Sequence, residues 1–205
     1  MLNKNLLLIL TRNPELGKCK TRLAAKVGDE AALEIYKFLI ERTVDFTKDL
    51  AVDKWVFYSE KIWEDDIWDH TIYSKKLQKG TDLGERMKNA FSEGFNAGFK
   101  NVIIIGSDMY HLNPSDLEEA FAQLENHDFV VGPAQDGGYY LLGMKSLKEE
   151  LFQQKAWGTD TVLKDTLKDI SNFKVSLLEE KNDIDYYEDI KDIKVFEPFL
   201  KHIKE

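Results

Sequence analysis

Short apolar runs alternate with longer amphipathic stretches along this chain, and this alternation limits the folds it can adopt. Leu6–Leu10 and Val102–Ile105 are continuous apolar runs, the pattern of strands buried on both faces of a parallel sheet. Stretches with helical periodicity separate such runs, as in repeated βα units. The sequence therefore predicts an α/β fold: one domain over residues 1–205, with a Rossmann-like, mostly parallel sheet and helices on both of its faces.

The boundaries of the expected elements follow from hydrophobic period and from cap residues such as Asn113, which precedes a helix-compatible proline. Strands are predicted at Leu6–Thr11, Lys54–Tyr58, Thr71–Ser74, Asn101–Gly106, Asp128–Gly132, Tyr139–Met144 and Lys174–Leu178. Helices are predicted at Glu30–Leu50, Asp82–Ala97, Pro114–Asn126, Thr159–Ile170 and, as a pair, within Tyr186–His202.

Composition excludes several classes of protein. The chain has 205 residues, 43% of them apolar, which suffices for one sizeable core. Its net charge of −9 argues against a general nucleic-acid or membrane-surface binder. No apolar run approaches the length of a membrane span, and Arg12 and Pro14 directly follow the first run, unlike a signal peptide. Cys19 is the single cysteine, so an internal disulfide is excluded. A cytoplasmic location is expected.

Positive charge is concentrated around the loop after the first predicted strand. Residues 1–27 contain six basic residues and one acidic residue. In α/β sheets ligands bind beyond the carboxyl ends of the strands, and a helix start offers free N–H groups to anions. We therefore expect Arg12, Gly17, Lys20 and Arg22 to bind phosphates, with Lys20 and Arg22 acting in catalysis. The alternative is an ordinary loop with exposed charges, since the P-loop spacing is absent.

Three aspartates are candidate metal ligands. Asp108 directly follows a buried strand, where an unpaired carboxylate is costly. Mg²⁺ is commonly held by one or two carboxylates plus substrate phosphates, so Asp108 suits Mg²⁺ or Mn²⁺ better than it suits a helix cap, a role that Asn113 can fill. Asp183 and Asp185 alternate along an extended segment and could complete the site. Asp185 is equally suited to cap the next helix, and the sequence does not choose between the two.

A glycine-containing turn joins two of the predicted strands at Asp136, Gly137 and Gly138. Adjacent glycines let a ligand approach the backbone, and Asp136 could bind a hydroxyl group or the metal. Asp-Gly is also a strong hairpin signal, and both interpretations can hold together.

Another strand-to-helix junction offers substrate contacts. Gln78 and the backbone around Gly80 and Gly84 are candidates for reading a base edge, and Arg86 for binding a phosphate or a buried carboxylate. Asp82 is a further candidate, although capping of the next helix is the favoured role for its side chain. No histidine, serine or cysteine lies in a pattern for covalent catalysis.

These segments together resemble the nucleotide-diphospho-sugar transferase superfamily with the glycosyltransferase-A fold. The likeness rests on Pro14-x-x-Gly17-x-x-Lys20-Thr21-Arg22-Leu23, Asp82-Leu83-Gly84-Glu85-Arg86-Met87, Gly106-Ser107-Asp108, Gly132-Pro133-Ala134-x-Asp136-Gly137-Gly138-Tyr139-Tyr140-Leu141, Trp157-x-Thr159 and Asp183-x-Asp185. It is closest to a bacterial group of proposed glycosyltransferases found near radical-SAM or selenium-related genes, related to the 2-phospho-L-lactate guanylyltransferases.

The resemblance implies that the first loop binds phosphates, that residues 78–84 face the base and that Asp108 holds the divalent metal. It also implies that the Asp136 turn and the Asp183/Asp185 pair border the acceptor or the metal. The chain departs from the family pattern at Tyr110, where the family usually has a proline two residues after the aspartate.

The expected activity is direct transfer without a covalent enzyme intermediate, from a nucleotide or nucleotide-sugar to a small acceptor. Nucleotidyl transfer is favoured because a basic loop suits a departing pyrophosphate. The alternatives are a glycosyltransferase that uses a nucleoside-diphosphate sugar and, given Tyr110, a nucleotide-binding protein without catalysis. Neither nucleic acid nor a membrane is expected as a partner.

Overall fold

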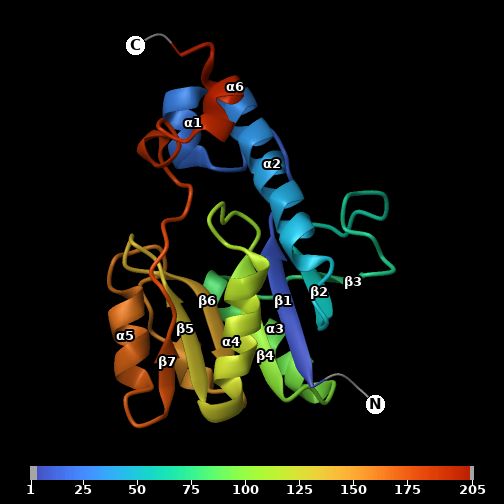
Figure 1. Cartoon of the computed structure of the whole chain (residues 1–205), viewed down its shortest axis with the longest axis vertical. Coiled ribbons are helices and arrows are strands. Elements are labelled where there is room, and N and C mark those ends of the chain that lie inside the picture. The colour runs from blue at the N-terminus through green and yellow to red at the C-terminus, as the bar shows by residue number, and fades with distance from the viewer. Residues whose placement is uncertain (1–3, 204–205) are drawn as a thin grey trace.

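The computed structural model describes residues 4–203, and its centre is one seven-stranded sheet (Figure 1). The strands are β1 (Asn5–Thr11), β2 (Asp53–Tyr58), β3 (Tyr73–Leu77), β4 (Asn101–Gly106), β5 (Phe129–Pro133), β6 (Tyr139–Met144) and β7 (Val175–Leu177). Their order in the sheet is β3-β2-β1-β4-β6-β5-β7. β6 is the one strand of this sheet that runs antiparallel to its neighbours. The predicted fold class is confirmed.

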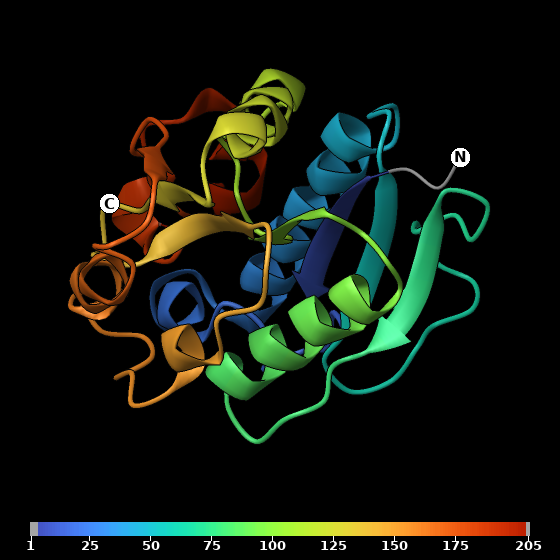
Figure 2. The ribbon, with the colours of Figure 1, turned by 90° about the horizontal axis from the view of Figure 1, so that it is seen from below.

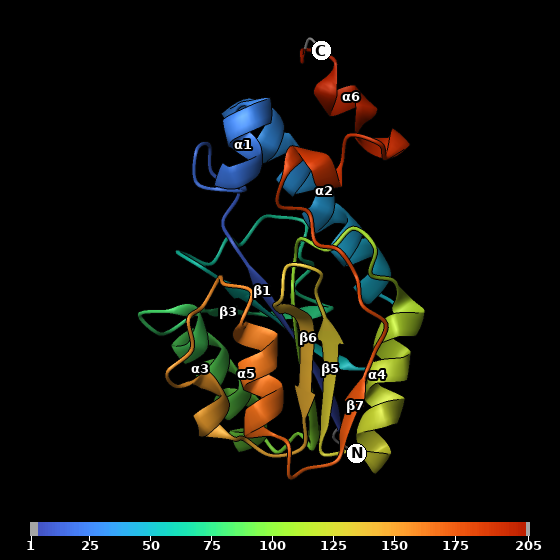
Figure 3. The same ribbon diagram turned by 90° about the vertical axis from the view of Figure 1, so that its left-hand side faces the viewer.

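Helices cover both faces of the sheet (Figures 2 and 3). They are α1 (Thr21–Val27), α2 (Asp29–Thr47), α3 (Leu83–Asn96), α4 (Pro114–Asn126), α5 (Val162–Asp169) and α6 (Glu197–Leu200), with short 3-10 helices η1 (Glu149–Phe152), η2 (Tyr187–Asp189) and η3 (Lys194–Phe196). α2 and α4 lie on one face, and α3 and α5 lie on the other.

Side chains of β1 alternate between two cores, as the pleat of a strand requires. Leu7 and Ile9 join the core under α2 and α4, whereas Leu6 and Leu8 join the core under α3. All four side chains are completely buried. The continuous apolar run therefore supplies both faces of the sheet, which is why it could be recognised as a central strand.

The strand order reverses between β1 and β4. The two strands are parallel, and Leu10 pairs with Gly106 near their carboxyl ends. The segment after Thr11 and the segment after Gly106 therefore begin next to each other, at the same edge of the sheet. This is the switch point at which ligands of open α/β sheets bind.

Several boundaries differ from the predicted ones. β3 lies at Tyr73–Leu77 instead of Thr71–Ser74, because the polar Lys75 and Lys76 of this edge strand hid its continuation. The helices α1 and η1 were absent from the prediction, and the expected C-terminal helix pair consists of the short η2, η3 and α6. Each of these elements is too short for a hydrophobic period to reveal it.

A third, smaller apolar cluster lies above the carboxyl ends of the strands. It joins Leu23 and Val27 of α1, Ile35 of α2, and Ile184 and Phe196 of the C-terminal segment, all nearly inaccessible to solvent. This cluster fixes the first loop against the segment that carries Asp183 and Asp185. Within residues 4–203, no helix combines the length and apolar character needed to cross a membrane.

Candidate active site

A cleft of about 740 Å³ opens at the carboxyl ends of β1 and β4. Its position is the one that the reversal of strand order predicts. Among its lining residues are these predicted site residues: Arg12, Lys20, Arg22, Gln78, Asp82, Arg86, Asp108, Asp136, Gly138, Asp183 and Asp185. Segments that are far apart in the sequence thus meet around one cavity.

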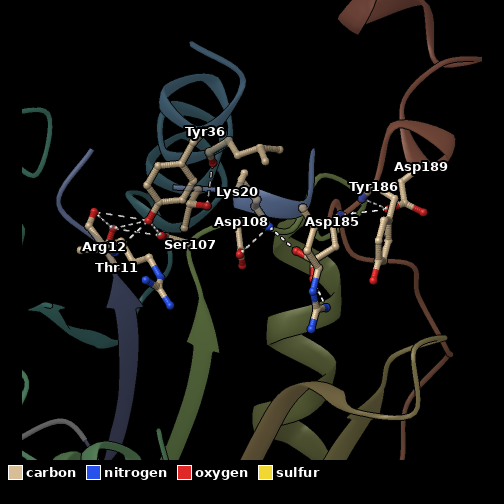
Figure 4. A network of polar contacts seen from close by, with 12 residues as sticks. Thr11, Arg12, Lys20, Tyr36, Ser107, Asp108, Asp185, Tyr186 and Asp189 are labelled. Carbon is tan, nitrogen blue, oxygen red and sulfur yellow. Dashed lines mark hydrogen bonds and ion pairs between the residues drawn. The ribbon is translucent and has the colours of Figure 1, made fainter. Parts of the chain in front are cut away.

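An ion-pair network joins two of the predicted metal ligands to the basic loop, by which we mean the loop after β1 that carries Lys20 together with Arg22 at the start of α1 (Figure 4). Lys20 Nζ lies 2.8 Å from Asp108 Oδ2 and 3.1 Å from Asp185 Oδ1. Arg22 Nη1 lies 3.1 Å from Asp185 Oδ2. The Lys20 side chain is 5% exposed, against 39% for Asp108 and 30% for Asp185. The ammonium group is therefore covered, and the carboxylates remain open to the cleft.

The pair keeps both of its groups charged. Burial opposes the charged form of Lys20, but Asp108 and Asp185 outweigh it and raise the pKa of Lys20 above its ordinary value. Burial alone would raise the pKa of Asp108, but Lys20 lowers it below the ordinary range of a carboxyl group. The cleft therefore contains fixed charges of both signs at neutral pH.

Asp183 is the uncompensated carboxylate of the group. Within the described residues its side chain makes no hydrogen bond and no ion pair. Burial, followed by the neighbouring Asp185 and Asp136, raises the pKa of Asp183 to about 6. Ile184 between the two aspartates is fully buried, so Asp183 and Asp185 both line the cleft, as alternation along an extended segment predicts.

Asp185 does not cap the helix that follows it, which was the alternative role. Its carboxylate binds Lys20 and Arg22, and Asp189 provides the capping acceptor instead. Asp189 Oδ2 accepts hydrogen bonds from the backbone N–H groups of Asp185 at 2.9 Å and Tyr186 at 2.6 Å. Asn113 and Asp116 likewise form the cap box at the start of α4, which leaves Asp108 free for the cleft.

Divalent cations are a chemical match for these carboxylates, although the residues 4–203 contain no ready-made cluster of three or more acidic, histidine or cysteine side chains able to hold a metal. Mg²⁺ needs only one or two carboxylates when substrate phosphates and water supply the remaining oxygens. Asp108 and Asp185, with Asp183 beside them, provide that smaller set.

A buried hydroxyl network that the sequence did not reveal fixes the ends of the two central strands (Figure 4). Tyr36 Oη of α2 accepts a hydrogen bond from the Arg12 backbone N–H at 2.8 Å and lies 3.1 Å from Ser107 Oγ. Ser107 Oγ donates in turn to Thr11 Oγ1 at 2.9 Å. In the sequence Tyr36 has only the spacing of a core residue, so nothing marked it as a member of the site.

Arg12 is available for an anion. Its side chain is exposed, lines the cleft and makes no ion pair among the described residues. Lys18, by contrast, is paired with Glu15 at 2.6 Å. Cys19 is buried, and its thiol lies 3.4 Å from the Asn13 carbonyl oxygen. Burial raises the pKa of Cys19, which agrees with the expectation that it is no nucleophile.

Four predicted substrate-contacting glycines do not line the cleft: Gly17, Gly80, Gly84 and Gly137. Gly17 and Gly80 serve turns, with φ of 73° and 139°, a region that glycine adopts at little cost. A Cβ at Gly84 would lie 2.6 Å from Trp157 Nε1, and one at Gly137 would lie 2.3 Å from the Asp160 carbonyl oxygen. Gly84 and Gly137 therefore let the segment carrying Trp157 pack closely. Contact of these four glycines with a substrate stays a prediction.

Gln78 lines the cleft, but the donor hydrogens of its side-chain amide are engaged within the protein. Gln78 Nε2 donates to the Thr11 carbonyl at 3.0 Å and to the Phe57 carbonyl at 2.9 Å. Both donor hydrogens are therefore used to hold β1 and β2 together. Arg86 Nε donates to the Gly80 carbonyl at 3.2 Å, and so braces the loop.

Asp82 caps α3, as the favoured interpretation held. Its carboxylate accepts from the Glu85 backbone N–H at 2.9 Å. The same residue lines the cleft, so the cap does not exclude a substrate contact.

One end of the cleft is apolar, and the sequence had not indicated its residues as part of the site. Leu83, Met87, Tyr139 and Trp157 line this end. Leu83 is 45% exposed, and the Tyr139 hydroxyl lies 3.9 Å from Met87 Sδ. The family-like motifs contain these positions, but their residue types are equally typical of a core.

Comparison with known proteins agrees with the fold. The family model described as "Uncharacterized protein conserved in bacteria (DUF2064)" matches residues 43–159. No curated protein matches the sequence. The chain is similar to a "putative nucleotide-diphospho-sugar transferase" from Desulfovibrio desulfuricans G20, with a TM-score of 0.82 and 29% identity over 90% of this chain and 84% of the other.

More distant structures share the fold. The inositol-1-phosphate CTP transferase from T. maritima has a TM-score of 0.53 and 14% identity over 100% of this chain and 98% of the other. A cytidylyltransferase from Leptospira borgpetersenii serovar Hardjo-bovis has a TM-score of 0.51 and 19% identity over 88% and 76%. The predicted superfamily is confirmed, and the predicted class of enzyme, a transferase, is the class that these relatives carry in their names.

Proposed function

This chain belongs to the DUF2064 family, and from that premise and the geometry of the cleft we propose that it is a transferase that acts on a nucleoside triphosphate or a nucleotide-sugar with the help of Mg²⁺ or Mn²⁺. Nucleotidyl transfer to a small acceptor is the favoured reaction. The structural relatives named as cytidylyltransferase and CTP transferase support this class of activity.

One observation carries the proposal. At the carboxyl ends of the central strands, Lys20 Nζ lies within 3.1 Å of a carboxylate oxygen of both Asp108 and Asp185. A nucleotide's phosphates need cations on several sides, because charge accumulates on the leaving group in the transition state. The basic loop supplies cationic side chains, and the carboxylates supply ligands for a divalent metal ion.

Asp108 and Asp185 would hold the metal, and Asp183 lines the same cleft as a third carboxylate. When bound, the ion supplies charge neutralisation on phosphate oxygens and fixes their geometry. The protein's own cations carry the rest. Arg12 is unpaired within residues 4–203 and reaches the cleft, where its planar fork can bind a phosphate. Lys20 and Arg22 would stabilise a departing pyrophosphate.

The reaction then proceeds by positioning and electrostatics, without a covalent enzyme intermediate. An acceptor oxygen attacks the α-phosphorus, and pyrophosphate leaves toward the basic loop. The one thiol near the cleft, Cys19, is buried and hydrogen-bonded. The acceptor would bind against Asp136, Tyr139 and Trp157, which also line the cleft.

The product formed from the donor distinguishes the two transfer reactions. Purified protein should be incubated with Mg²⁺, with each nucleoside triphosphate or nucleoside-diphosphate sugar, and with a panel of hydroxyl and phosphate acceptors. Release of pyrophosphate supports nucleotidyl transfer. Release of a nucleoside diphosphate supports glycosyl transfer, which the likeness to a nucleotide-diphospho-sugar transferase keeps as the second candidate. Neither product across the panel would contradict both.

A change at Asp108 tests the site itself. Asp108→Asn should lower kcat/KM by about 10²–10³-fold, the usual effect of losing one electrostatic stabiliser. Asp45→Asn is the control, because Asp45 is exposed on α2 and pairs with Lys48 on the helix surface. Equal activity of Asp108→Asn and the control would remove Asp108 from the proposed role.

A further inference from the structure

Lys20 has a second role that concerns the state of the cleft before substrate binds. Its ammonium group lies between Asp108 Oδ2 and Asp185 Oδ1, at 2.8 Å and 3.1 Å. These are the two carboxylates proposed above as ligands of the divalent cation. A cation of this chain therefore already neutralises the ligands that an external cation would use.

We propose that Lys20 is a built-in competitor of the divalent cation, so that the metal binds weakly alone and tightly only together with a nucleotide's phosphates. This inference rests on the proposed function, since it assumes that Asp108 and Asp185 are the ligands. It adds that metal and nucleotide bind cooperatively, because the phosphates give the ammonium group another partner and release the carboxylates.

The burial of the two kinds of group supports this arrangement. The Lys20 side chain is 5% exposed, so its charge is poorly hydrated and depends on the carboxylates for compensation. The carboxylates are 39% and 30% exposed and face the cleft. A divalent ion that approached from the cleft would meet a positive charge directly behind its ligands. To bind, the ion would have to displace the Lys20 ammonium group from the carboxylates or would be repelled by its charge.

Arg22 strengthens the effect at one of the two ligands. Its Nη1 lies 3.1 Å from Asp185 Oδ2, while Lys20 uses Asp185 Oδ1. Both oxygens of Asp185 are thus engaged with cations of the basic loop. A phosphate chain entering the cleft attracts Lys20 and Arg22 together and frees both oxygens at once. By thermodynamic linkage, the metal must then increase nucleotide affinity by the same factor.

Binding of Mn²⁺ alone tests the proposal without any activity measurement. Free Mn²⁺ is followed by electron paramagnetic resonance during titration of the wild-type protein, Lys20→Met and Lys20→Arg. Lys20→Met removes the charge and keeps an unbranched side chain, whereas Lys20→Arg keeps the charge and serves as the matched control. We expect Mn²⁺ to bind Lys20→Met at least about tenfold more tightly than the wild type, the size of effect usual for coupled sites, with Lys20→Arg close to the wild type.

Three further measurements make the result decisive. Circular dichroism shows whether each variant is folded, and Lys20→Gln replaces Lys20→Met if the latter is not. Asp108→Asn combined with Lys20→Met should lose the gained affinity, which assigns the Mn²⁺ to this site. Adding inorganic triphosphate should increase the apparent Mn²⁺ affinity of the wild type more than that of Lys20→Met, after correction for Mn²⁺ chelated in solution.

Equal Mn²⁺ affinity of the wild type and the uncharged variants would overturn the inference, as would a gain that survives the Asp108→Asn change. Either result would leave the proposed function standing, because that function is judged by pyrophosphate or nucleoside diphosphate release from the wild type. Failure of product release with a clear Lys20→Met gain would instead preserve the inference about competition and remove the catalytic proposal.

Discussion

Replacing Asp183 by asparagine should make the metal-free protein more stable at neutral pH. In the folded protein the pKa of Asp183 is raised from 3.8 to about 6, first by burial and then by Asp185 and Asp136. The folded state therefore binds a proton more tightly than the unfolded state does. The contribution of Asp183 to stability is therefore most favourable below pH 3.8. It falls as pH rises through the window between the two pKa values, and the full cost is present above about pH 6.

The size of the cost follows from the same shift. About two pKa units correspond to about 3 kcal/mol of differential interaction. Asp183 is partly exposed, and solvent screening reduces this value, so we expect a gain of about 1–2 kcal/mol for Asp183→Asn. For a chain of this length such a gain raises Tm by about 2–8 °C. The gain should disappear below about pH 4, where the wild-type carboxyl is protonated in both states.

Urea unfolding between pH 4 and 8, in buffer containing a chelator, measures this difference. Asp45→Asn controls for the loss of one negative charge, because Asp45 is exposed and lies on α2 away from the cleft. A stability difference between Asp183→Asn and the wild type that is constant across this pH range would refute the reasoning. So would a destabilisation at pH 8, which would mean that Asp183 has a stabilising partner.

Other substitutions test separate parts of the structure. Gly84→Ala should lower the free energy of unfolding by about 1–3 kcal/mol, measured by urea unfolding, because its Cβ would lie 2.6 Å from Trp157 Nε1. Tyr36→Phe should cost about 1 kcal/mol and lower kcat more than it raises KM, because the hydroxyl holds the Arg12 backbone; unchanged kcat would contradict this role. Thr166→Val should raise Tm slightly, since Thr166 Oγ1 is buried without a partner in the described part of the chain.

The convergence of Lys20 and Asp108 on one cleft could be predicted from topology, whereas their direct ion pair at 2.8 Å could not. Both residues come shortly after buried strands that are parallel and adjacent, so the carboxyl ends of these strands bring them to one edge of the sheet. No detail of side-chain packing is needed for this step. The Asp183 and Asp185 pair could be placed at the same edge only as an expectation, because the segment after β7 has no periodic pattern to fix its path.

The roles of single polar side chains near the cleft could not be predicted in the same way. Gln78 looked available for a base because its amide is polar and lies in a loop, but it binds two backbone carbonyls within the protein. Tyr36 looked like a core residue, but its hydroxyl joins two strand ends. Such roles depend on which donor and acceptor are within about 3 Å, and sequence spacing does not determine that distance.

Tyr110 illustrates how a departure from a family pattern can be structural. The resemblance seen in the sequence implies a proline at this position, which would fix the backbone after Asp108 by its ring. Tyr110 is absent from the lining of the cleft, and its ring packs against Phe196 at 5.1 Å between centroids. Arg42 lies 4.9 Å from the centre of the Tyr110 ring and donates to its carbonyl oxygen at 2.5 Å.

These contacts can hold the Asp108 loop as a proline would, by interactions from α2 and the C-terminal segment instead of a covalent ring. They also tie that loop to the segment that follows Asp185, so the two proposed metal ligands are held by one aromatic cluster. The presence of tyrosine is then by itself no argument for a protein that binds nucleotides without catalysis, because Tyr110 does not line the cleft where the reaction would occur.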